Sequence, residues 1–354
     1  MEHFVIDDIR KVYELLEDEI SKEIYMARLN FLVTRDYKYL RSAIEKYVPQ
    51  VPALNGLTVI DLRRSLPENR KIILYGAGEN AEASLDNWER DERFIGFCDR
   101  DTEKQKSGLK GYPVIKPEQL LEMENVSVVI STHWGSKEIS NFLVQSGFPE
   151  DRIYEMGPYV VCGDTGQYFN PDFMTFGEEV FVDAGCKDLG TSLKLTKYCS
   201  HLKKVYAFEP DDNNYRDCLE RKAAFPETDV EVFHCGTWSE TTTIRFNANA
   251  SGTSHVCEDG ETSIEVMSID EAVGAKDRVT FIKMDVEGSE LKSGEGARNT
   301  IQRDKPKLAI CIYHKPEDMV EIPLYIKELV PEYKLYVRHH SNWECETVLY
   351  AIMP

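Results

Sequence analysis

The chain lacks several features that would assign it to a familiar functional class. No apolar stretch approaches the roughly 20 residues that a membrane-spanning helix needs, and the first residues contain neither the basic nor the apolar segment of a secretion signal. Basic residues are outnumbered, with 42 Lys and Arg against 62 Asp and Glu. Because nucleic-acid affinity depends on clustered Lys and Arg, this balance argues against a nucleic-acid partner. We therefore expect a cytoplasmic protein without a membrane-inserted segment.

The nine cysteines follow no metal-binding pattern. None forms a Cys-x-x-Cys pair or a zinc-ligand spacing, and several lie inside apolar runs. Such cysteines are typical of reduced thiols that pack in a core. The sequence therefore predicts no zinc site and no disulfide framework.

Length and breaks in the pattern suggest four segments, because 354 residues exceed most single cores. Apolar residues recur every three or four positions near the start, which predicts helices that pack against the body or against a second copy of the chain. Prolines and an Asn-Gly pair then end the helical pattern. We predict a helical extension at 1–68, a Rossmann-like domain at 69–157, a linker at 158–176 and a second α/β domain at 177–354.

The second α/β domain begins with a strand and a glycine loop. The apolar run at 180–182 ends on Asp183, and Gly185 and Gly190 follow. The next apolar strand ends on Glu209. An acid at the end of the second strand of a βαβ unit is placed to bind both ribose hydroxyls, and a glycine loop lets the backbone approach a ligand. The pair predicts a nucleoside site.

Charge separates the candidate cofactors. A dinucleotide site presents helix N–H groups to a pyrophosphate, whereas Asp183 directly before the glycine loop would repel phosphate and attract a cation. S-adenosylmethionine, with a sulfonium, an amino group and a ribose, suits this arrangement. The alternative is that Asp183 caps a turn and Glu209 is an exposed strand end. The loop after the third strand, with Cys235 and Gly236, is predicted to lie at the adenine edge, unless it is an ordinary glycine turn.

The reacting groups are predicted at two further strand ends. The apolar strand at 279–284 ends on Asp285, with Glu287 and Glu290 close behind, and the strand at 307–313 ends on His314. Short alternating strands and helices predict a doubly wound, mostly parallel sheet, and ligands bind at the carboxyl ends of its strands. Methyl transfer to a hydroxyl needs alignment and removal of one proton, so Asp285 or His314 is the predicted base. A helix N-terminal acid exposed to solvent would explain Glu290.

These motifs resemble the FkbM family of S-adenosylmethionine-dependent methyltransferases. The resemblance rests on residues 181–185, 206–210, 268–271 and above all 282–290, and covers roughly residues 177 to 351. It implies an O-methyltransferase that acts on a hydroxyl of a sugar, a polysaccharide unit or a related metabolite. It also implies Asp183, Gly185 and Gly190 at the methionine end, Glu209 at the ribose, and Asp285 and Glu287 near the reacting atoms, with Glu287 toward the substrate. The chain departs from the family at Cys186-Lys187, where relatives commonly carry Ala-Asn.

The first α/β domain contains a separate glycine motif. A strand at 71–75 is followed by Gly76-Ala-Gly78, and the next strand ends on Asp99. The segment from about 71 to 155 resembles the nucleotide-sugar-binding domain of bacterial sugar N-acetyltransferases. That resemblance implies a nucleotide-sugar at Gly76, Gly78 and Asp99. A dimerisation or docking module is the alternative.

Two other functions stay open from the sequence. Asp285, Glu287 and His314 offer oxygen and imidazole ligands, so a divalent cation could lower the pKa of the acceptor hydroxyl. A scaffold that binds a nucleotide-sugar and carries an inactive methyltransferase fold is the alternative from another class. Lys187, a positive charge within the glycine loop, is the residue that favours it.

Overall fold

The structure is a computed structural model, which describes residues 6–34, 38–48, 62–63, 65–89, 91–132, 135–156, 166–247, 255–256, 262–341 and 344–354. The chain forms two compact units. The large unit comprises Met1–Tyr47, Gly163–His340 and Glu344–Pro354, and the small unit comprises Val48–Cys162 and Ser341–Trp343. The helices expected as a separate extension therefore belong to the same unit as the second α/β domain.

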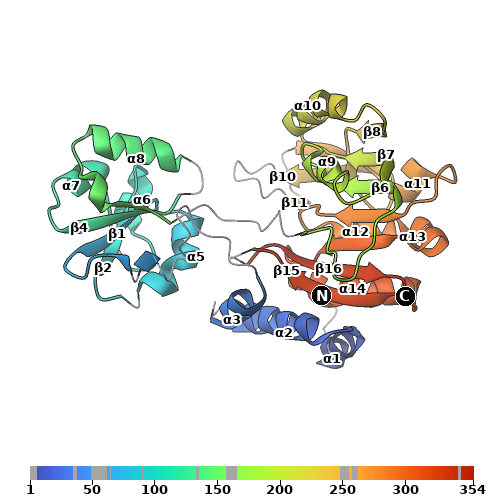
Figure 1. Ribbon diagram of the computed structural model, residues 1–354, viewed down its shortest axis with the longest axis horizontal. Helices are drawn as coiled ribbons and strands as arrows, with labels where there is room; N and C mark the ends of the chain where they lie inside the picture. The colour runs from blue at the N-terminus through green and yellow to red at the C-terminus, as the bar shows by residue number, and fades with distance from the viewer. Residues whose placement is uncertain are drawn as a thin grey trace. The chain divides into compact units, whose positions relative to one another are not determined.

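The large unit is built on a seven-stranded sheet (Figure 1). Its strands are β6 (Glu178–Ala184), β7 (His201–Phe208), β8 (Asp229–Phe233), β13 (Phe281–Met284), β14 (Lys307–Cys311), β15 (Lys334–His339) and β16 (Thr347–Ile352). The order across the sheet is β15-β16-β14-β13-β6-β7-β8. The five strands from β8 to β14 are parallel, and β16 joins β14 antiparallel. The prediction of a doubly wound, mostly parallel sheet is confirmed.

The strand order reverses between β6 and β13. From β6 the chain runs outward through β7 and β8, then returns to place β13 on the other side of β6. In open α/β sheets such a switch point leaves a crevice beyond the carboxyl ends of the two central strands. The register pairs Lys283 with Asp183 and Met284 with Ala184, so both strands end at the same level. The ends of β6 and β13 are therefore the place to look for a ligand site.

Helices connect these strands, and two of them begin at side-chain caps. Asp211 accepts hydrogen bonds from the N–H groups of Asn213 and Asn214, and Ser268 accepts one from Glu271. Such caps satisfy N–H groups that the first helical turn leaves free. The helices are α9 (Gly190–Leu195), α10 (Asp212–Arg221), α11 (Ile269–Val273), α12 (Glu290–Glu295), α13 (Arg298–Asp304) and α14 (Asp318–Leu329), with a 3-10 turn η3 (Lys222–Ala224).

A second, four-stranded sheet interrupts the large unit between β8 and α11. Its order is β11-β10-β12-β9. The strands are β9 (Gly236–Thr237), β10 (Thr242–Asn247), β11 (His255–Val256) and β12 (Thr262–Met267). The strand β10 pairs antiparallel with both β11 and β12.

The N-terminal helices pack on the antiparallel edge of the large sheet. They are α1 (Ile6–Leu15), α2 (Glu19–Thr34) and α3 (Lys38–Tyr47), and α1 and α2 lie beside α14 and β15 (Figure 1). Val12, Leu16 and Ile24 are buried in the same core as the sheet residues. Arg338 of β15 pairs with Asp18, whose carboxylate it contacts at 2.6 and 3.2 Å. The apolar stripe read from the sequence is therefore the face by which these helices join the body.

The segment expected to be a linker also packs, in its described part, on the large unit. Tyr168, Phe169 and Met174 are buried in one of its hydrophobic clusters, and Phe169 contacts Phe281 of β13 edge to face. The glycines and prolines of 158–176 suggested a flexible connection, but the aromatic residues between them bury apolar area that favours packing. Residues 166–176 are thus part of the fold that surrounds the strand ends.

The small unit is a five-stranded parallel sheet in the order β3-β2-β1-β4-β5. Its strands are β1 (Lys71–Tyr75), β2 (Phe94–Cys98), β3 (Val114–Ile115), β4 (Val126–Ile130) and β5 (Ile153–Glu155). Its helices are α5 (Glu79–Trp88), α6 (Thr102–Ser107), α7 (Pro117–Leu121), α8 (Ser136–Gln145) and η1 (Glu150–Arg152). The Rossmann-like arrangement predicted for this part of the chain is confirmed.

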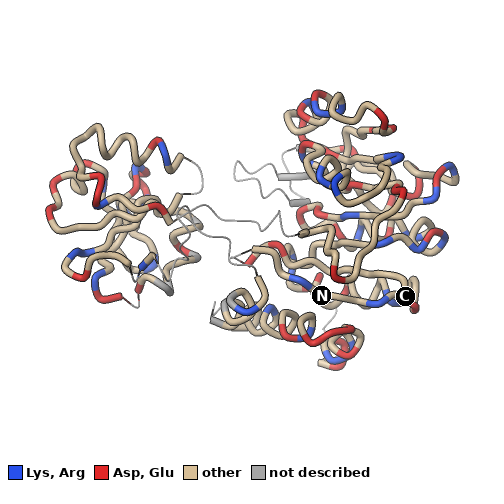
Figure 2. Tube along the Cα trace, viewed as in Figure 1, with Lys and Arg blue, Asp and Glu red and all other residues tan. Residues whose placement is uncertain are grey.

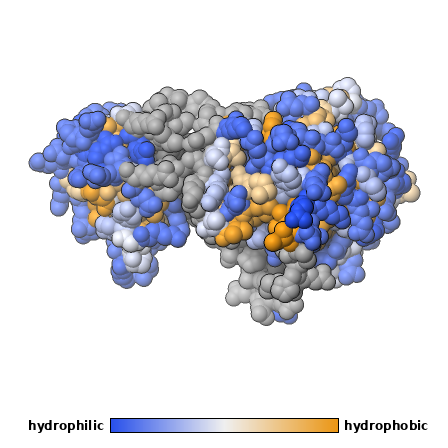
Figure 3. Space-filling view, turned by 90° about the horizontal axis from the view of Figure 1, so that it is seen from below, coloured by the Kyte–Doolittle hydropathy of each residue, from blue (hydrophilic) through white to orange (hydrophobic). Residues whose placement is uncertain are grey.

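Positive and negative residues are interspersed along the described parts of both units (Figure 2). The face shown in Figure 3 is largely hydrophilic, with hydrophobic residues in small groups. None of the described helices combines the length and apolar character needed to cross a membrane.

Candidate functional site

The glycine loop after β6 is held tightly against the end of β13. Gly185 has φ +74°, and a Cβ there would lie 1.9 Å from the backbone oxygen of Asp285. The N–H groups of Gly185 and Cys186 both donate to the carbonyl of Phe208 at the end of β7, at 3.1 and 3.0 Å. Only glycine meets both the left-handed backbone and the close approach. The loop is therefore a fixed cradle between two strand ends.

Asp183 lies beneath this loop. It is 0 % exposed, accepts a hydrogen bond from Ser192 Oγ at 2.7 Å, and lies 3.3 Å from Lys283 Nζ. From the sequence, Asp183 is predicted to attract a cationic ligand. In the structure the cation beside it is Lys283, because a fully buried carboxylate needs a partner. Asp183 thus supports the loop from inside and is not among the residues that line the neighbouring pocket.

Glu209 ends β7 and ties the glycine loop to that strand. Its Oε2 accepts the N–H of Lys187 at 2.9 Å, and its Oε1 accepts the N–H of Asp211 at 2.9 Å. Burial raises the pKa of Glu209, and the hydrogen bonds from Asp211, Asn214 and Lys187 oppose that rise. Each carboxylate oxygen has a second lone pair. Glu209 therefore lies directly after β7, where it was predicted from the sequence. Its hydrogen bond from Lys187 also fixes the glycine loop.

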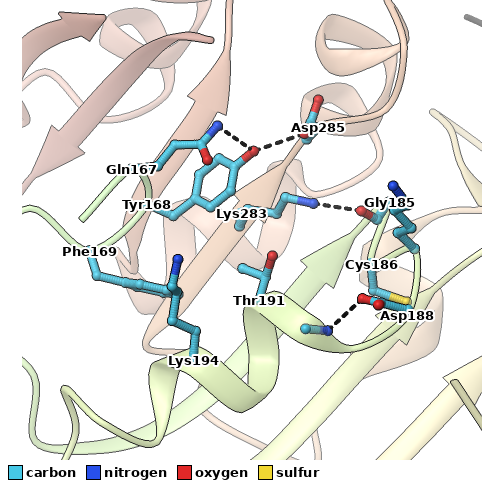
Figure 4. A pocket seen from close by; sticks show the side chains of 12 residues that line it. Gln167, Tyr168, Phe169, Gly185, Cys186, Asp188, Thr191, Lys194, Lys283 and Asp285 are labelled. Atoms are coloured by element: carbon cyan, nitrogen blue, oxygen red, sulfur yellow. Dashed lines mark hydrogen bonds between the residues drawn. The ribbon is translucent and has the colours of Figure 1, made fainter. Parts of the chain in front are cut away.

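A cavity of about 280 Å³ opens at the switch point (Figure 4). Its wall combines the glycine loop, the start of α9, the end of β13 and the segment before β6. The lining residues are Gln167, Tyr168, Phe169, Gly185, Cys186, Lys187, Asp188, Gly190, Thr191, Lys194, Lys283 and Asp285. Charges of both signs and two aromatic rings thus surround one space. This mixture suits a ligand that carries cationic, anionic and apolar groups.

Asp285 stands at the edge of the cavity between two tyrosines. Tyr168 donates to its Oδ2 at 2.8 Å, and Tyr313 lies 3.4 Å from its Oδ1 (Figure 4 shows the first contact). Burial alone would raise the pKa of Asp285, but the positive charges of Lys283 and His314 hold that pKa below its ordinary value. Asp285 is thus an ionised carboxylate, as a residue at a reacting edge requires.

His314 follows β14 and is surrounded by carboxylates, as the sequence expected for one shared edge. Its Nδ1 lies 2.8 Å from Glu290 Oε1, and its Nε2 lies 3.4 Å from Glu287 and 3.6 Å from Asp285. Burial lowers the pKa of His314, but the negative charges of the three acids have the larger effect and raise it to about 9. An imidazolium at neutral pH has no lone pair to accept a proton. Of the two predicted bases, Asp285 and His314, the raised pKa of His314 favours Asp285.

Glu290 and Glu287 differ sharply in environment. Glu290 is 1 % exposed and accepts the N–H of Val286 at 2.9 Å, so it is not the solvated helix acid that its position suggested. The Glu287 side chain is 46 % exposed, and the burial of its other part raises its pKa to about 7, although the positive charge of His314 acts in the opposite direction. Asp285, Glu290 and His314 hold ligand-type atoms within 4.8 Å of one another. The ligand set suggested from the sequence was Asp285, Glu287 and His314. In the structure, Glu290 takes the place of Glu287 in this group.

The other predicted cofactor residues divide into two sets. Gly190 begins α9, lines the cavity and donates its N–H to Asp188 at 2.9 Å. Cys235 is buried in the core, and Gly236 pairs with Val266 in the smaller sheet, so neither lines the cavity. Lys187, the departure from the family pattern, has φ +57° and an exposed side chain. Its charge is therefore shielded by water.

Several lining residues had no predicted role, and three of them are central to the site. Lys283 donates to the carbonyls of Gly185 and Ala184 at 2.6 and 3.2 Å, and Gln167 and Tyr168 come from the supposed linker. A lysine inside an apolar strand was a usable signal, because a buried ammonium needs a partner. The contact of residues 167–168 with the region of Asp285 could not be predicted, because these segments lie far apart in the sequence.

The glycine motif of the small unit forms a similar strand-end loop. Gly76 has φ +105°, and a Cβ there would lie 2.4 Å from Thr132 Cγ2. Asp99 accepts the N–H groups of Ala77 and Asp101 at 2.8 and 2.9 Å. Burial would raise the pKa of Asp99, but these hydrogen bonds and Lys104 lower it. Gly78 directly precedes α5, and a Cβ added at this residue would meet no other atom within 4 Å.

Comparisons with known proteins agree with the chemistry of the large unit. Residues 183–334 match the family model of the methyltransferase FkbM domain, and residues 68–154 match the model named C2185-like, N-terminal. No curated protein gave a significant match.

Solved structures similar to the chain include the following three. One is methyltransferase FkbM from Methylobacillus flagellatus KT, at 21% identity over 93% of this chain and 98% of that one, with a TM-score of 0.49. Another is a putative methyltransferase from Streptococcus mutans in complex with SAH, at 12% identity over 50% and 91%, with a TM-score of 0.32. A third is TYW2 from M. jannaschii in complex with AdoMet, at 17% identity over 51% and 70%, with a TM-score of 0.28.

The family match begins at Asp183, at the end of β6, and extends into β15, so it includes the glycine loop, Glu209, Asp285 and His314. These are the residues that the fold gathers at the switch point. Residues 183–334 of this chain are a methyltransferase FkbM domain, and the protein is a methyltransferase.

Proposed function

We propose that this protein is an S-adenosylmethionine-dependent O-methyltransferase that acts on a hydroxyl of a sugar, a polysaccharide unit or a related metabolite. One observation carries the proposal: the cavity at the switch point lies between the glycine loop and Asp285. The match of residues 183–334 to the methyltransferase FkbM domain supports it. The sugar-type acceptor rests on the family resemblance of the sequence motifs.

The cavity residues fit the cofactor. Gly185 allows the loop to lie directly against the end of β13, and Asp285 offers a negative charge that complements a cationic sulfonium. Glu209, which lies outside the cavity lining, is the proposed acceptor for the ribose hydroxyls, through the lone pair of Oε2 that Lys187 leaves free; Oε1 already accepts from Asp211 and Asn214. When bound, S-adenosylmethionine supplies an electrophilic methyl group on sulfur.

The protein's own residues would align the acceptor and take its proton. Asp285 accepts a hydrogen bond from the acceptor hydroxyl, and Glu287, which is more exposed, contacts the rest of the acceptor. Methylation of the acceptor oxygen would make the hydroxyl proton strongly acidic. Even a carboxylate whose pKa is lowered, such as Asp285, then accepts the proton. His314 stays protonated and serves as a counter-ion to the acids around it.

Cofactor binding tests the proposal directly. We expect calorimetry to show S-adenosylhomocysteine binding to the wild type, and Glu209→Ala to weaken that binding by about tenfold or more, as loss of hydrogen bonds to a charged group predicts. Asp99→Ala is the matched control, because it removes the corresponding strand-end acid of the small unit. Equal losses in both variants would remove the ribose assignment of Glu209. Absence of binding to the wild type would reject the cofactor.

A divalent cation would modify this mechanism without changing the reaction. The observation in its favour is the close group of Asp285, Glu290 and His314. A cation there would lower the pKa of the acceptor hydroxyl. Turnover that is lost with EDTA and restored by Mg²⁺ would support the cation, and turnover that EDTA leaves unchanged would exclude it.

For the small unit, we propose binding of a nucleotide-linked sugar at the loop of Gly76, Gly78 and Asp99. The support is the strand order, whose switch point between β1 and β4 places this loop at the carboxyl edge of the sheet. Calorimetry with a panel of UDP-sugars tests it, with Asp99→Ala as the loss variant and Glu209→Ala as the control. A nucleotide-sugar signal without any S-adenosylmethionine signal would favour the non-catalytic scaffold. No signal with any UDP-sugar would favour a docking or dimerisation role for this unit.

A further inference from the structure

Lys283 is a buried cation at the centre of the proposed cofactor site. It lies on β13 directly opposite Asp183 of β6, is 2 % exposed, and contributes to the cavity wall. A lysine at such a position loses its hydration, which disfavours its charge. The nearby Asp183 and Asp285 more than compensate and raise its pKa above the ordinary value. The ammonium is therefore a permanent part of the site.

The ammonium contacts the backbone of the glycine loop as well as a side chain. Nζ donates to the carbonyl of Gly185 at 2.6 Å and to that of Ala184 at 3.2 Å (Figure 4 shows the Gly185 contact). Its third neighbour is Asp183 Oδ1, at 3.3 Å. Two N–H groups of the ammonium thus bond the loop carbonyls, and its charge forms an ion pair with Asp183.

The same loop is fixed on its N–H side by β7. Gly185 and Cys186 donate to the Phe208 carbonyl, and the N–H of Lys187 donates to Glu209. The carbonyl side depends on Lys283. A loop fixed on both sides needs little ordering when a ligand arrives, and this preorganisation raises affinity.

We propose that Lys283 is a positioning residue, which holds the carbonyl side of the glycine loop in the shape that binds the cofactor and neutralises Asp183 beneath it. The effect on the cofactor rests on the proposed function, whereas the effect on the loop is a property of the free protein. The two can therefore be measured separately.

The experiment compares three variants of the full chain. Lys283→Met removes the ammonium, and Lys283→Met combined with Asp183→Asn also removes the carboxylate that would be left buried without a counter-ion. Lys307→Met is the matched control. Lys307 forms an ion pair with the buried Glu179, at 2.9 Å, but it is the first residue of β14 and so lies away from the carboxyl ends of the strands. All are measured by amide hydrogen exchange of residues 184–190 without ligand, and by calorimetry with S-adenosylhomocysteine.

In both Lys283 variants we expect faster exchange in the loop, by about tenfold or more, and a similar loss of affinity, since hydrogen bonds from a charged donor are removed. Lys307→Met should leave loop exchange and affinity unchanged even if it unfolds at a lower temperature. Wild-type exchange in the loop of the double variant would overturn the proposal, because the ion pair would then have only a structural role. If the wild type binds no S-adenosylhomocysteine, the cofactor proposal fails, while the exchange result still decides the role of Lys283.

Discussion

Replacement of His314 by glutamine would show how much the buried acids depend on its charge. The His314 side chain is 11 % exposed and faces Glu290, Asp285 and Glu287, with Asp318 and Lys315 nearby. These acids raise its pKa from the ordinary 6.5 to about 9. A glutamine side chain is neutral at every pH, so the variant removes the charge while keeping a polar group at this position.

The magnitude follows from proton linkage. A pKa that rises on folding contributes stability that is complete below the unfolded value and is lost as the pH rises through the folded value. For His314 that window runs from 6.5 to about 9. At about 1.4 kcal/mol for each pH unit, the contribution is about 3 kcal/mol at the acid end of the window. Wild type should therefore exceed His314→Gln in unfolding free energy by about this much near pH 6, and by little above pH 9.

Urea unfolding of both proteins, in buffer with EDTA and at several pH values across that window, provides the measurement. His201→Gln is the control, because it removes an exposed histidine beside Glu178, and exposed ion pairs contribute little. Parallel stability curves for wild type and His314→Gln would refute the reasoning, since they would mean that the ring carries no additional proton in the folded protein. Direct titration of the His314 ring by NMR would then show its true pKa.

Three further outcomes are expected. Gly185→Ala should reduce S-adenosylhomocysteine affinity at least tenfold and lower the melting temperature, because its Cβ would meet the Asp285 carbonyl; Gly177→Ala, with open space around it, should change neither. Asp285→Asn should reduce turnover by about 100-fold or more, as loss of a proton acceptor predicts, and a variant with wild-type turnover would exclude that role. Asp18→Ala should destabilise the large unit by about 2 kcal/mol in urea unfolding, because the buried Arg338 loses its carboxylate partner. Asp7→Ala, which breaks an exposed pair, is its control, and equal losses would contradict the argument.

Much of the fold could be predicted because its signals are local. Short apolar runs with turns between them marked the strands of both units. The segments at 1–47 and 166–176 could not be assigned to the large unit in this way. Their apolar residues showed that they pack, but the surface they pack on comes from β13, β15 and α14, far along the chain.

The site shows the same division between local and distant information. Gly185, Glu209 and Asp285 could be predicted because each follows directly on a strand, and strand ends meet at one edge of a parallel sheet. The direction in which each side chain faces could not be predicted. Asp183 faces Lys283, Glu290 faces His314, and Tyr168 reaches Asp285 from a segment that resembled a linker.

By itself, the sequence determined which groups are present at the strand ends: the glycines that allow a tight loop, and the acids that suit a cationic cofactor and an acceptor hydroxyl. Only the tertiary structure decided their charge states and roles. Protonation depends on burial and on charges contributed by other strands, so His314 became a cation, Asp285 stayed an anion, and Lys283 became the group that joins the two central strands. Neighbours that lie about 100 residues away in the chain, such as Asp183 and Lys283, are brought together only when β6 and β13 pair.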